Sequence, residues 1–336
     1  DGSLPDQDDS FRLAADAIMQ NYDAREGGYG GPPKFPQPFF LGLLMQDAMA
    51  HGDERAKEQV LWTLRKMAEG GIYDQLAGGF HRYSVDAKWL VPHFEKMLYD
   101  NALLPPLYLD AARLSGDPFY ARIAEETLDY VVRELRTPEG AFYASTDADS
   151  EGVEGKYFVW SLDELNAIVG ADAELFATYY DVSQDGNFEG TNILHVTAPM
   201  EQAAEAVGTD TKRVSSRLAA ARAKLLSVRA ERVPPATDTK VIVAWNGMMI
   251  DALARGGAQL DAPRFVEAAV AAAAFQLNTL RTGAADGTLH RIYAGGRVSV
   301  TAFLDDYASL ADGLLSLYEA TGDERWFREA RNLVEE

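Results

Sequence analysis

The repeated pairing of two amphipathic helices around a short polar turn constrains this chain more than any other feature. Apolar residues recur at three- and four-residue spacing along most of the sequence, and long strand-like runs are absent. Short turns rich in Gly, Asp or Pro join the helical segments in pairs, at AHGDERA, LSGDPFY, LDAPRF and TGDERWF. The sequence therefore predicts an all-α fold built from helical hairpins.

The hairpins share a register. Pro36, Asp100, Asn246 and Asp306 each stand sixteen positions before a residue of the turn that ends their helix. The interval between the second and third starts is about twice the others, which predicts one irregular hairpin at residues 161–231. First helices are thus expected to begin near positions 36, 100, 246 and 306.

Hairpins of this kind can stack into an open solenoid or a closed toroid. The segments after the second helices are long and rich in Gly, aromatic and charged residues, as loops that line a central cavity would be. We predict a single (α/α)6-type toroid over residues 1–336, with short β-hairpin loops. The chain is expected to stop before the last hairpin of such a toroid, because its final helix carries no C-cap signal.

The charge balance and residue content exclude several classes of protein. The 31 basic and 52 acidic residues give a net charge of -21, which repels nucleic acid and anionic membrane surfaces. There is no cysteine for disulfides or thiolate metal sites. The longest apolar run, Ala268 to Phe275, is far shorter than the roughly 20 residues that span a bilayer. The N-terminal DGSLPDQDDS lacks the features of a signal peptide, so a cytoplasmic location is expected.

The densest candidate site is the segment 78–102, where ionisable side chains alternate with rings. The ionisable residues are His81, Arg82, His93, Glu95 and Asp100, and the rings are those of Phe80, Tyr83, Trp89, Phe94 and Tyr99. Rings beside hydrogen-bonding groups suit a sugar, whose C–H faces stack on aromatics while its hydroxyls need donors and acceptors. The polar edge of a helix beside a core face would explain the same residues without a ligand, so both interpretations stay open.

An acidic loop forms the next candidate, with Asp147, Asp149, Glu151 and Glu154 within eight positions. Its start resembles a calcium loop, but Phe158 stands where the bidentate Glu is needed. No metal site is therefore predicted. A solvated acidic loop and carboxylates acting on a ligand remain as alternatives.

Polar residues with aromatic neighbours recur at the starts of three first helices. They are Tyr99 and Asp100, Trp245 and Asn246, and Asp305, Asp306 and Tyr307. Helix capping explains Asp and Asn at these positions, but it does not explain the rings. No Walker loop, dinucleotide fingerprint or zincin motif is found, and no cofactor is predicted.

Several long segments resemble the successive motifs of the YyaL-type, spermatogenesis-associated thioredoxin-like proteins. They are GGYGGPPKFP, GGFHRYSVDAKWLVPHFEKMLYDNALL, STDADSEGVEGKYFVW, DGNFEGTNIL and DTKVIVAWNGMMIDALA. Members of that family carry a thioredoxin-like domain followed by a helical toroid similar to N-acylglucosamine 2-epimerases and six-hairpin glycosidases. The resemblance implies a six-hairpin glycosidase-like fold here. It also makes the thioredoxin-like domain, absent from this sequence, or a C-terminal segment a possible partner.

The resemblance implies a carbohydrate-type ligand and leaves three functions open. Epimerases of the related fold use paired histidines and glycosidases use paired carboxylates. A sugar isomerase or epimerase would use His81 and His93. A glycoside hydrolase would use two of Asp100, Asp147, Asp149, Asp305 and Asp306. A non-catalytic toroid would only bind a ligand or serve as a scaffold. The expected catalytic residues are His81, His93, Asp100 and Asp306, and the expected substrate-binding residues are Arg82, Trp89, Glu95, Tyr99, Asp147, Asp149, Trp245, Asn246, Asp305 and Tyr307.

Overall fold

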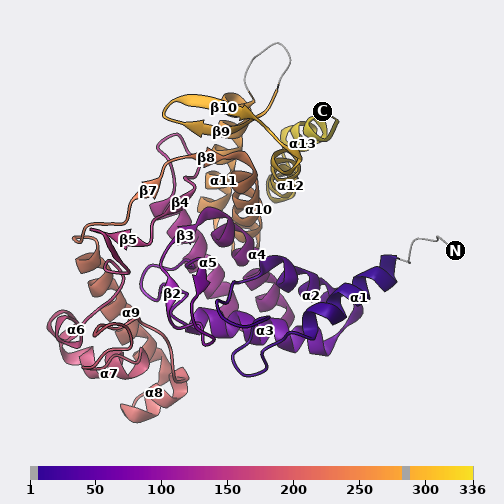
Figure 1. The fold of residues 1–336 in the computed structure, drawn as a ribbon. Helices are drawn as coiled ribbons and strands as arrows, with labels where there is room; N and C mark the ends of the chain where they lie inside the picture. Colours follow the sequence, from indigo (N-terminus) through magenta and orange to yellow (C-terminus); the bar gives the residue numbers. More distant parts are fainter. Residues whose placement is uncertain (1–6, 282–287, 336) are drawn as a thin grey trace. The chain divides into compact units, whose positions relative to one another are not determined.

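The protein is predominantly helical, as predicted. The computed structural model describes residues 7–281 and 288–335 and is 57% helical (Figure 1). Its strands are two to five residues long and pair as small antiparallel sheets, which confirms the predicted short β-hairpin loops. Within these residues no helix combines the length and apolar character needed to cross a bilayer. Residues 1–6, part of the N-terminal segment considered above, lie outside the described residues.

The chain divides into two compact units, each with its own packing. Unit 1 consists of Asp1–Ala77, His81–Phe94 and Ala148–Pro235, and unit 2 of Gly78–Phe80, Glu95–Asp147 and Ala236–Glu336. The single-domain organisation over residues 1–336 stays a prediction.

Unit 1 contains a helical hairpin, two short β-hairpins and a cluster of helices from residues 161–231, where an irregular hairpin was predicted. Its helices are α1 (Gln7–Met19), α2 (Pro38–His51), α3 (Glu54–Glu69), α6 (Leu162–Val169), α7 (Ala173–Tyr179), α8 (Met200–Ala206) and α9 (Thr211–Arg229). Its strand pairs are β1 (Tyr83–Ser84) with β2 (Pro92–His93), and β5 (Asp149–Ser150) with β6 (Val153–Glu154).

Unit 2 contains three helical hairpins and two small sheets. Its helices are α4 (Leu98–Ser115), α5 (Pro118–Glu134), α10 (Val243–Gln259), α11 (Pro263–Phe275), α12 (Leu304–Thr321) and α13 (Glu324–Glu335). One sheet has the order β3 (Lys96–Met97), β4 (Ser145–Thr146), β7 (Thr237–Asp238), and the other has β10 (Arg297–Thr301), β9 (His290–Ala294), β8 (Val241–Ile242). The first helices of the four hairpins, α2, α4, α10 and α12, begin close to the predicted positions 36, 100, 246 and 306.

A Gly-Asp pair forms the turn between α2 and α3 and the turn between α4 and α5. Gly52 and Gly116 end α2 and α4 in the left-handed conformation, with φ of 70° and 71°, where glycine has no steric penalty. The next residue caps the second helix. Asp53 accepts a hydrogen bond from the backbone N–H of Ala56, and Asp117 accepts one from Phe119. Two adjacent residues therefore stop one helix and start the next.

Helix α10 lies at the centre of unit 2, where it packs against α4, α11 and α12 (Figure 1). The α10–α12 contact is close because both helices present glycine. A Cβ atom at Gly247 would lie 2.5 Å from the backbone of Ser309, and one at Gly313 would meet the carbonyl oxygen of Gly247. Only glycine lets these two backbones approach so closely.

Two buried asparagines of unit 2, Asn101 and Asn246, each form hydrogen bonds with the backbone of a loop residue in the same unit. The Oδ1 atom of Asn101 accepts the N–H of Phe80 at 2.7 Å, while Nδ2 donates to the carbonyl of Phe80 at 3.0 Å. Asn246 binds the peptide groups of Phe142 in the same way, at 2.9 and 3.0 Å. The residue equivalent to Asn246 is thus Asn101, and the register predicted for Asp100 is wrong by one residue. A carboxylate cannot make this pair of bonds, because it has no N–H to donate.

We expect Asn101→Ala and Asn246→Ala each to lower the free energy of unfolding by about 1–3 kcal/mol or more, because each leaves a buried peptide donor and acceptor without partners. Denaturant titration measures the loss. Asn21→Ala is the matched control, since Asn21 is exposed and its side chain makes one long 3.4 Å bond to Ala17. An equal effect of all three substitutions would contradict this account.

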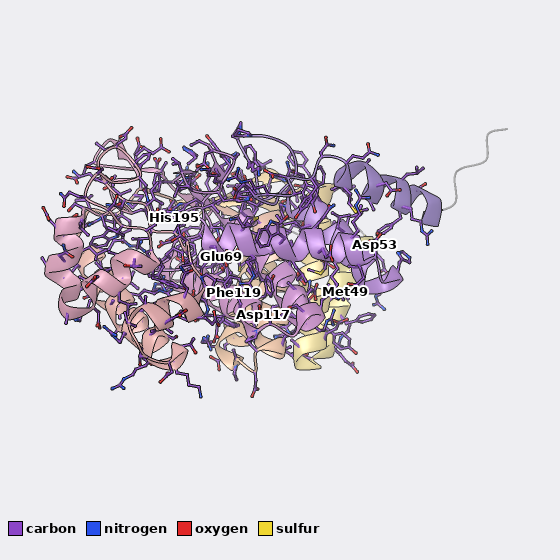
Figure 2. All side chains as sticks on the ribbon, turned by 90° about the horizontal axis from the view of Figure 1, so that it is seen from below. Met49, Asp53, Glu69, Asp117, Phe119 and His195 are labelled. Atoms are coloured by element: carbon purple, nitrogen blue, oxygen red, sulfur yellow. The ribbon has the colours of Figure 1, made fainter. Side chains whose placement is uncertain are left out.

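His195 lies in unit 1 (Figure 2), and its side chain is only 15% exposed. Burial lowers the pKa of His195 below 6.5, although the charge of Asp181, 3.3 Å from Nε2, acts to raise it. Asp86 also raises this pKa and Lys66 lowers it. Below pH 6.5 the unfolded chain binds this proton more readily than the folded chain, so acidification favours unfolding.

When the pH falls from about 7.5 to about 5.5, we therefore expect the free energy of unfolding to decrease less in His195→Gln than in the wild-type protein. Urea titrations at the two pH values measure the difference. An identical pH dependence in the two proteins would show that His195 does not contribute.

Candidate functional site

A small pocket in unit 1 contains one of the predicted catalytic residues. Its cavity volume is only about 20 Å³, and the pocket opens to solvent. The segment after α3, the end of α9 and three short loops contribute to it. It is lined by Gly71, Tyr73, Asp74, Gln75, Leu76, His81, Phe94, Phe158, Ile193, Leu194 and Arg229.

A buried ion pair forms one side of this pocket. Both guanidinium NH groups of Arg229 lie 2.9 Å from the two carboxylate oxygens of Asp74, and the side chains are 3% and 4% exposed. Asp74 Oδ1 also accepts the backbone N–H groups of Leu76 and Ala77. These bonds anchor the loop after α3 to the last turn of α9. Neither residue stood out in the sequence, because they are far apart along the chain and each is an ordinary charged residue.

His81 is almost completely buried at the edge of the pocket. Its Nδ1 lies 2.9 Å from the carbonyl oxygen of Phe94. Because a carbonyl only accepts, Nδ1 carries a proton, so Nε2 is the nitrogen that can act as a base when the ring is neutral. The rings of Phe94 and Phe158 meet the imidazole edge to face, at centroid distances of 5.3 and 4.8 Å. The ring is thus held in one orientation and one tautomer.

His93 lies on the neighbouring strand β2 and is 30% exposed. Its Nδ1 is 2.7 Å from Glu154 Oε1, and its ring stacks on Tyr83 at 5.1 Å. The β5–β6 hairpin carries Glu154 to this position. A carboxylate bound to Nδ1 orients the imidazole. The acidic loop drew attention in the sequence, but the spacing could not show which of its carboxylates meets a histidine.

The other predicted residues of unit 1 lie in different environments. Trp89 is fully buried, and its Nε1–H donates to the Glu26 carbonyl at 2.9 Å. Its ring therefore packs inside the unit and is not an accessible stacking surface. Arg82 is half-buried just before β1, and Asp149 is exposed in the β5–β6 hairpin.

In unit 2 an arginine binds the two predicted carboxylates of α12. Arg291 Nη1 lies 3.0 Å from Asp305 and 2.7 Å from Asp306. Burial acts to lower the pKa of Arg291, but the hydrogen bonds to these carboxylates raise it above its usual value. Asp306 is fully buried and also accepts the N–H groups of Ala244 and Phe303, so it caps α12 and ties it to α10. Capping accounts for this predicted catalytic residue.

The remaining predicted residues of unit 2 share no single environment. Tyr99 and Trp245 are half-buried and meet edge to face at 4.9 Å. Tyr307 packs partly against the core, and Asn246 forms the peptide contact already described. Asp100 is buried, Glu95 is half-buried and Asp147 is exposed. Among the described residues, no group of three or more His, Asp or Glu side chains is placed to hold a metal ion.

Comparison with solved structures shows the fold. A family 76 glycoside hydrolase from a bovine Bacteroides thetaiotaomicron strain matches 97% of this chain and 54% of its own, with a TM-score of 0.58 and 11% identity. A second family 76 enzyme, a mannosidase of Bacteroides thetaiotaomicron, has a TM-score of 0.54 and 9% identity over 97% of this chain and 70% of its own. The fold is therefore an α/α toroid of the six-hairpin glycosidase type, as predicted.

Sequence relatives place the chain more narrowly. No family model matches it. It is 36% identical to spermatogenesis-associated protein 20 of Homo sapiens over 94% of this chain, and 30% identical to an uncharacterized protein of Caenorhabditis elegans over 99%. The chain spans 45% and 50% of the lengths of these relatives. Across the region that it shares with them, the chain belongs to the family of spermatogenesis-associated protein 20.

Proposed function

We propose that this chain is a sugar-directed isomerase or epimerase in which His81 and His93 exchange protons with the substrate. One observation carries the proposal. Both imidazoles have Nδ1 held by an acceptor, the Phe94 carbonyl for His81 and the Glu154 carboxylate for His93. We therefore propose that the two Nε2 atoms exchange the protons. The fold shared with glycoside hydrolases supports a carbohydrate ligand.

The two histidines suit different halves of a proton transfer. Neutral His81 can take the proton from the sugar carbon next to the carbonyl, which leaves an enediol-type intermediate. His93, whose Nδ1 is held by Glu154, is proposed to return a proton. Return to the opposite face of the same carbon gives an epimer, and return to the neighbouring carbon gives the aldose–ketose isomer. Arg82, half-buried and next to His81 in sequence, is the proposed ligand for sugar hydroxyls.

The histidine mechanism has more support than the carboxylate mechanism. A glycoside hydrolase needs two carboxyl groups that face the glycosidic bond. Asp306 instead accepts two backbone N–H groups and Arg291. Asp305 is also bound by Arg291. The alternative of a toroid that only binds a ligand, or presents it to a thioredoxin-like domain, would show affinity without chemistry.

Exchange with solvent tests the proposal. We expect the protein to introduce deuterium from D₂O at the carbon next to the carbonyl of D-mannose, D-fructose, N-acetyl-D-mannosamine or cellobiose, followed by proton NMR. His81→Gln and His93→Gln should each slow this exchange by roughly 10²-fold or more, as expected on loss of a general acid or base.

His51→Gln is the matched control, because His51 on α2 makes the same type of bond, 2.7 Å from Nδ1 to Asp47, but has no role in the proposed proton transfer. It should exchange at the wild-type rate. Absence of exchange with all four sugars would overturn the proposal. Equal losses in His51→Gln and His93→Gln would show that the effect is structural.

A further inference from the structure

A second hollow in unit 1 shares no lining residue with the pocket around His81. It lies along one face of α3, which runs from its N-cap Asp53 to Glu69 (Figure 2). Its volume is about 430 Å³. The lining residues are Tyr22, Ala24, Arg55, Glu58, Gln59 and Trp62. We call it the α3 groove.

The helix aligns four of these side chains. Positions 55, 58, 59 and 62 are related by three and four residues, so they project from the same side of α3. Trp62 is the aromatic surface of the groove, with 39% of the residue exposed. Its Nε1–H donates to the carbonyl of Arg25 at 3.3 Å, which restrains the indole from rotating. The exposed indole is therefore held in place, and Lys66 Nζ lies over its ring, 5.6 Å from the centroid.

Three polar side chains near Trp62 on α3 have groups without a hydrogen-bond or ion-pair partner among the described residues. Arg55 and Glu58 are exposed, and neither has an ion-pair or hydrogen-bond partner among the described residues, whereas Lys57 on the same helix pairs with Glu54. Gln59 is 93% buried, and its Oε1 has no hydrogen-bond partner within that part of the chain. A buried acceptor without a partner costs free energy that a hydroxyl donor would recover.

Tyr22 adds a hydroxyl group to the lining of the groove. Burial and the charges of Asp23 and Glu58 raise the pKa of Tyr22 to about 12, so its phenol stays protonated at neutral pH. The groove thus combines a fixed indole, a phenol, a carboxylate, a guanidinium and an amide oxygen.

We infer that the α3 groove is a second carbohydrate-binding site, which takes a sugar ring against the indole of Trp62. The C–H face of a pyranose stacks on the ring, while Glu58, Arg55 and Gln59 Oε1 bind its hydroxyls. A simple anion would meet the carboxylate of Glu58, and an apolar peptide would desolvate both charged groups without replacing their hydrogen bonds. A neutral polyhydroxylated ligand satisfies all of these groups.

This site is independent of the proposed proton transfer and can hold a different part of the same glycan or a different one. Its test needs a signal from the groove alone. The chain has five tryptophans, so 5-fluorotryptophan labelling gives few fluorine resonances. Trp62→Phe identifies the resonance of Trp62 by its loss. Titration with N-acetyl-D-glucosamine, D-mannose and cellobiose then follows that resonance.

We expect at least one of these sugars to shift the Trp62 resonance in a saturable way. The titration gives the dissociation constant of the sugar. Glu58→Gln, which keeps the size of the side chain but removes its charge, should raise this constant by about tenfold or more. Phe39→Ala, which removes an aromatic 72% exposed on the neighbouring helix α2, should leave it unchanged. His93→Gln should also leave it unchanged, which separates this site from the proposed catalysis.

Two results would overturn the inference. The first is a Trp62 resonance that none of the three sugars shifts at the highest soluble concentration. The second is a shift with the same dissociation constant in Glu58→Gln and in Phe39→Ala. Unchanged thermal unfolding of Glu58→Gln confirms that any weakening is local. Loss of deuterium exchange in His93→Gln with a retained Trp62 shift would support both sites separately.

Discussion

The peptide contacts made by Asn101 and Asn246 are the interactions on which much of the loop arrangement depends. Each side-chain amide accepts from the backbone N–H and donates to the backbone C=O of a single residue in a preceding loop, Phe80 for Asn101 and Phe142 for Asn246. Because both asparagines lie in the first turn of a helix, the helix start also fixes where the loop ends. Phe80 directly precedes His81, and Phe142 leads into β4 and the acidic loop. His81 and the acidic loop that contains Glu154 therefore come, along the chain, after residues that are hydrogen-bonded to a helix.

The pocket around His81 shows how packing and chemistry share the same groups. The buried Asp74–Arg229 pair is worth little as a source of net stability, because removing two charges from water offsets much of their attraction. Its value lies in geometry, since it joins α9 to the loop that forms the pocket. The Phe94 carbonyl, a backbone group, fixes the tautomer of His81. The side chain of Phe94 packs against the same imidazole. The Phe94 contacts thus leave Nε2 of His81 as the nitrogen that can accept a proton.

Much of the fold was predictable because its signals are local. The Gly-Asp pairs at 52–53 and 116–117 determine where one helix stops and the next starts, whatever surrounds them. The site was less predictable. Trp89 and His93 belong to the same aromatic and ionisable segment, yet Trp89 is buried against Glu26 and His93 faces Glu154. The one-residue error at Asp100 has the same origin, because spacing cannot tell a carboxylate from the amide that the neighbouring loop requires.

The sequence by itself determined the helical hairpins, their turns, the acidic charge and the family to which the chain belongs, since these depend on residue type and short-range spacing. Only the tertiary structure decided which polar residues became caps, which became pocket walls and which stayed unused on α3. Asp306 became a cap and Arg229 a pocket wall, whereas Glu58 kept no partner among the described residues. The physical reason is that a polar side chain is assigned its role by the partner that satisfies it, and such partners are often a hundred or more residues away.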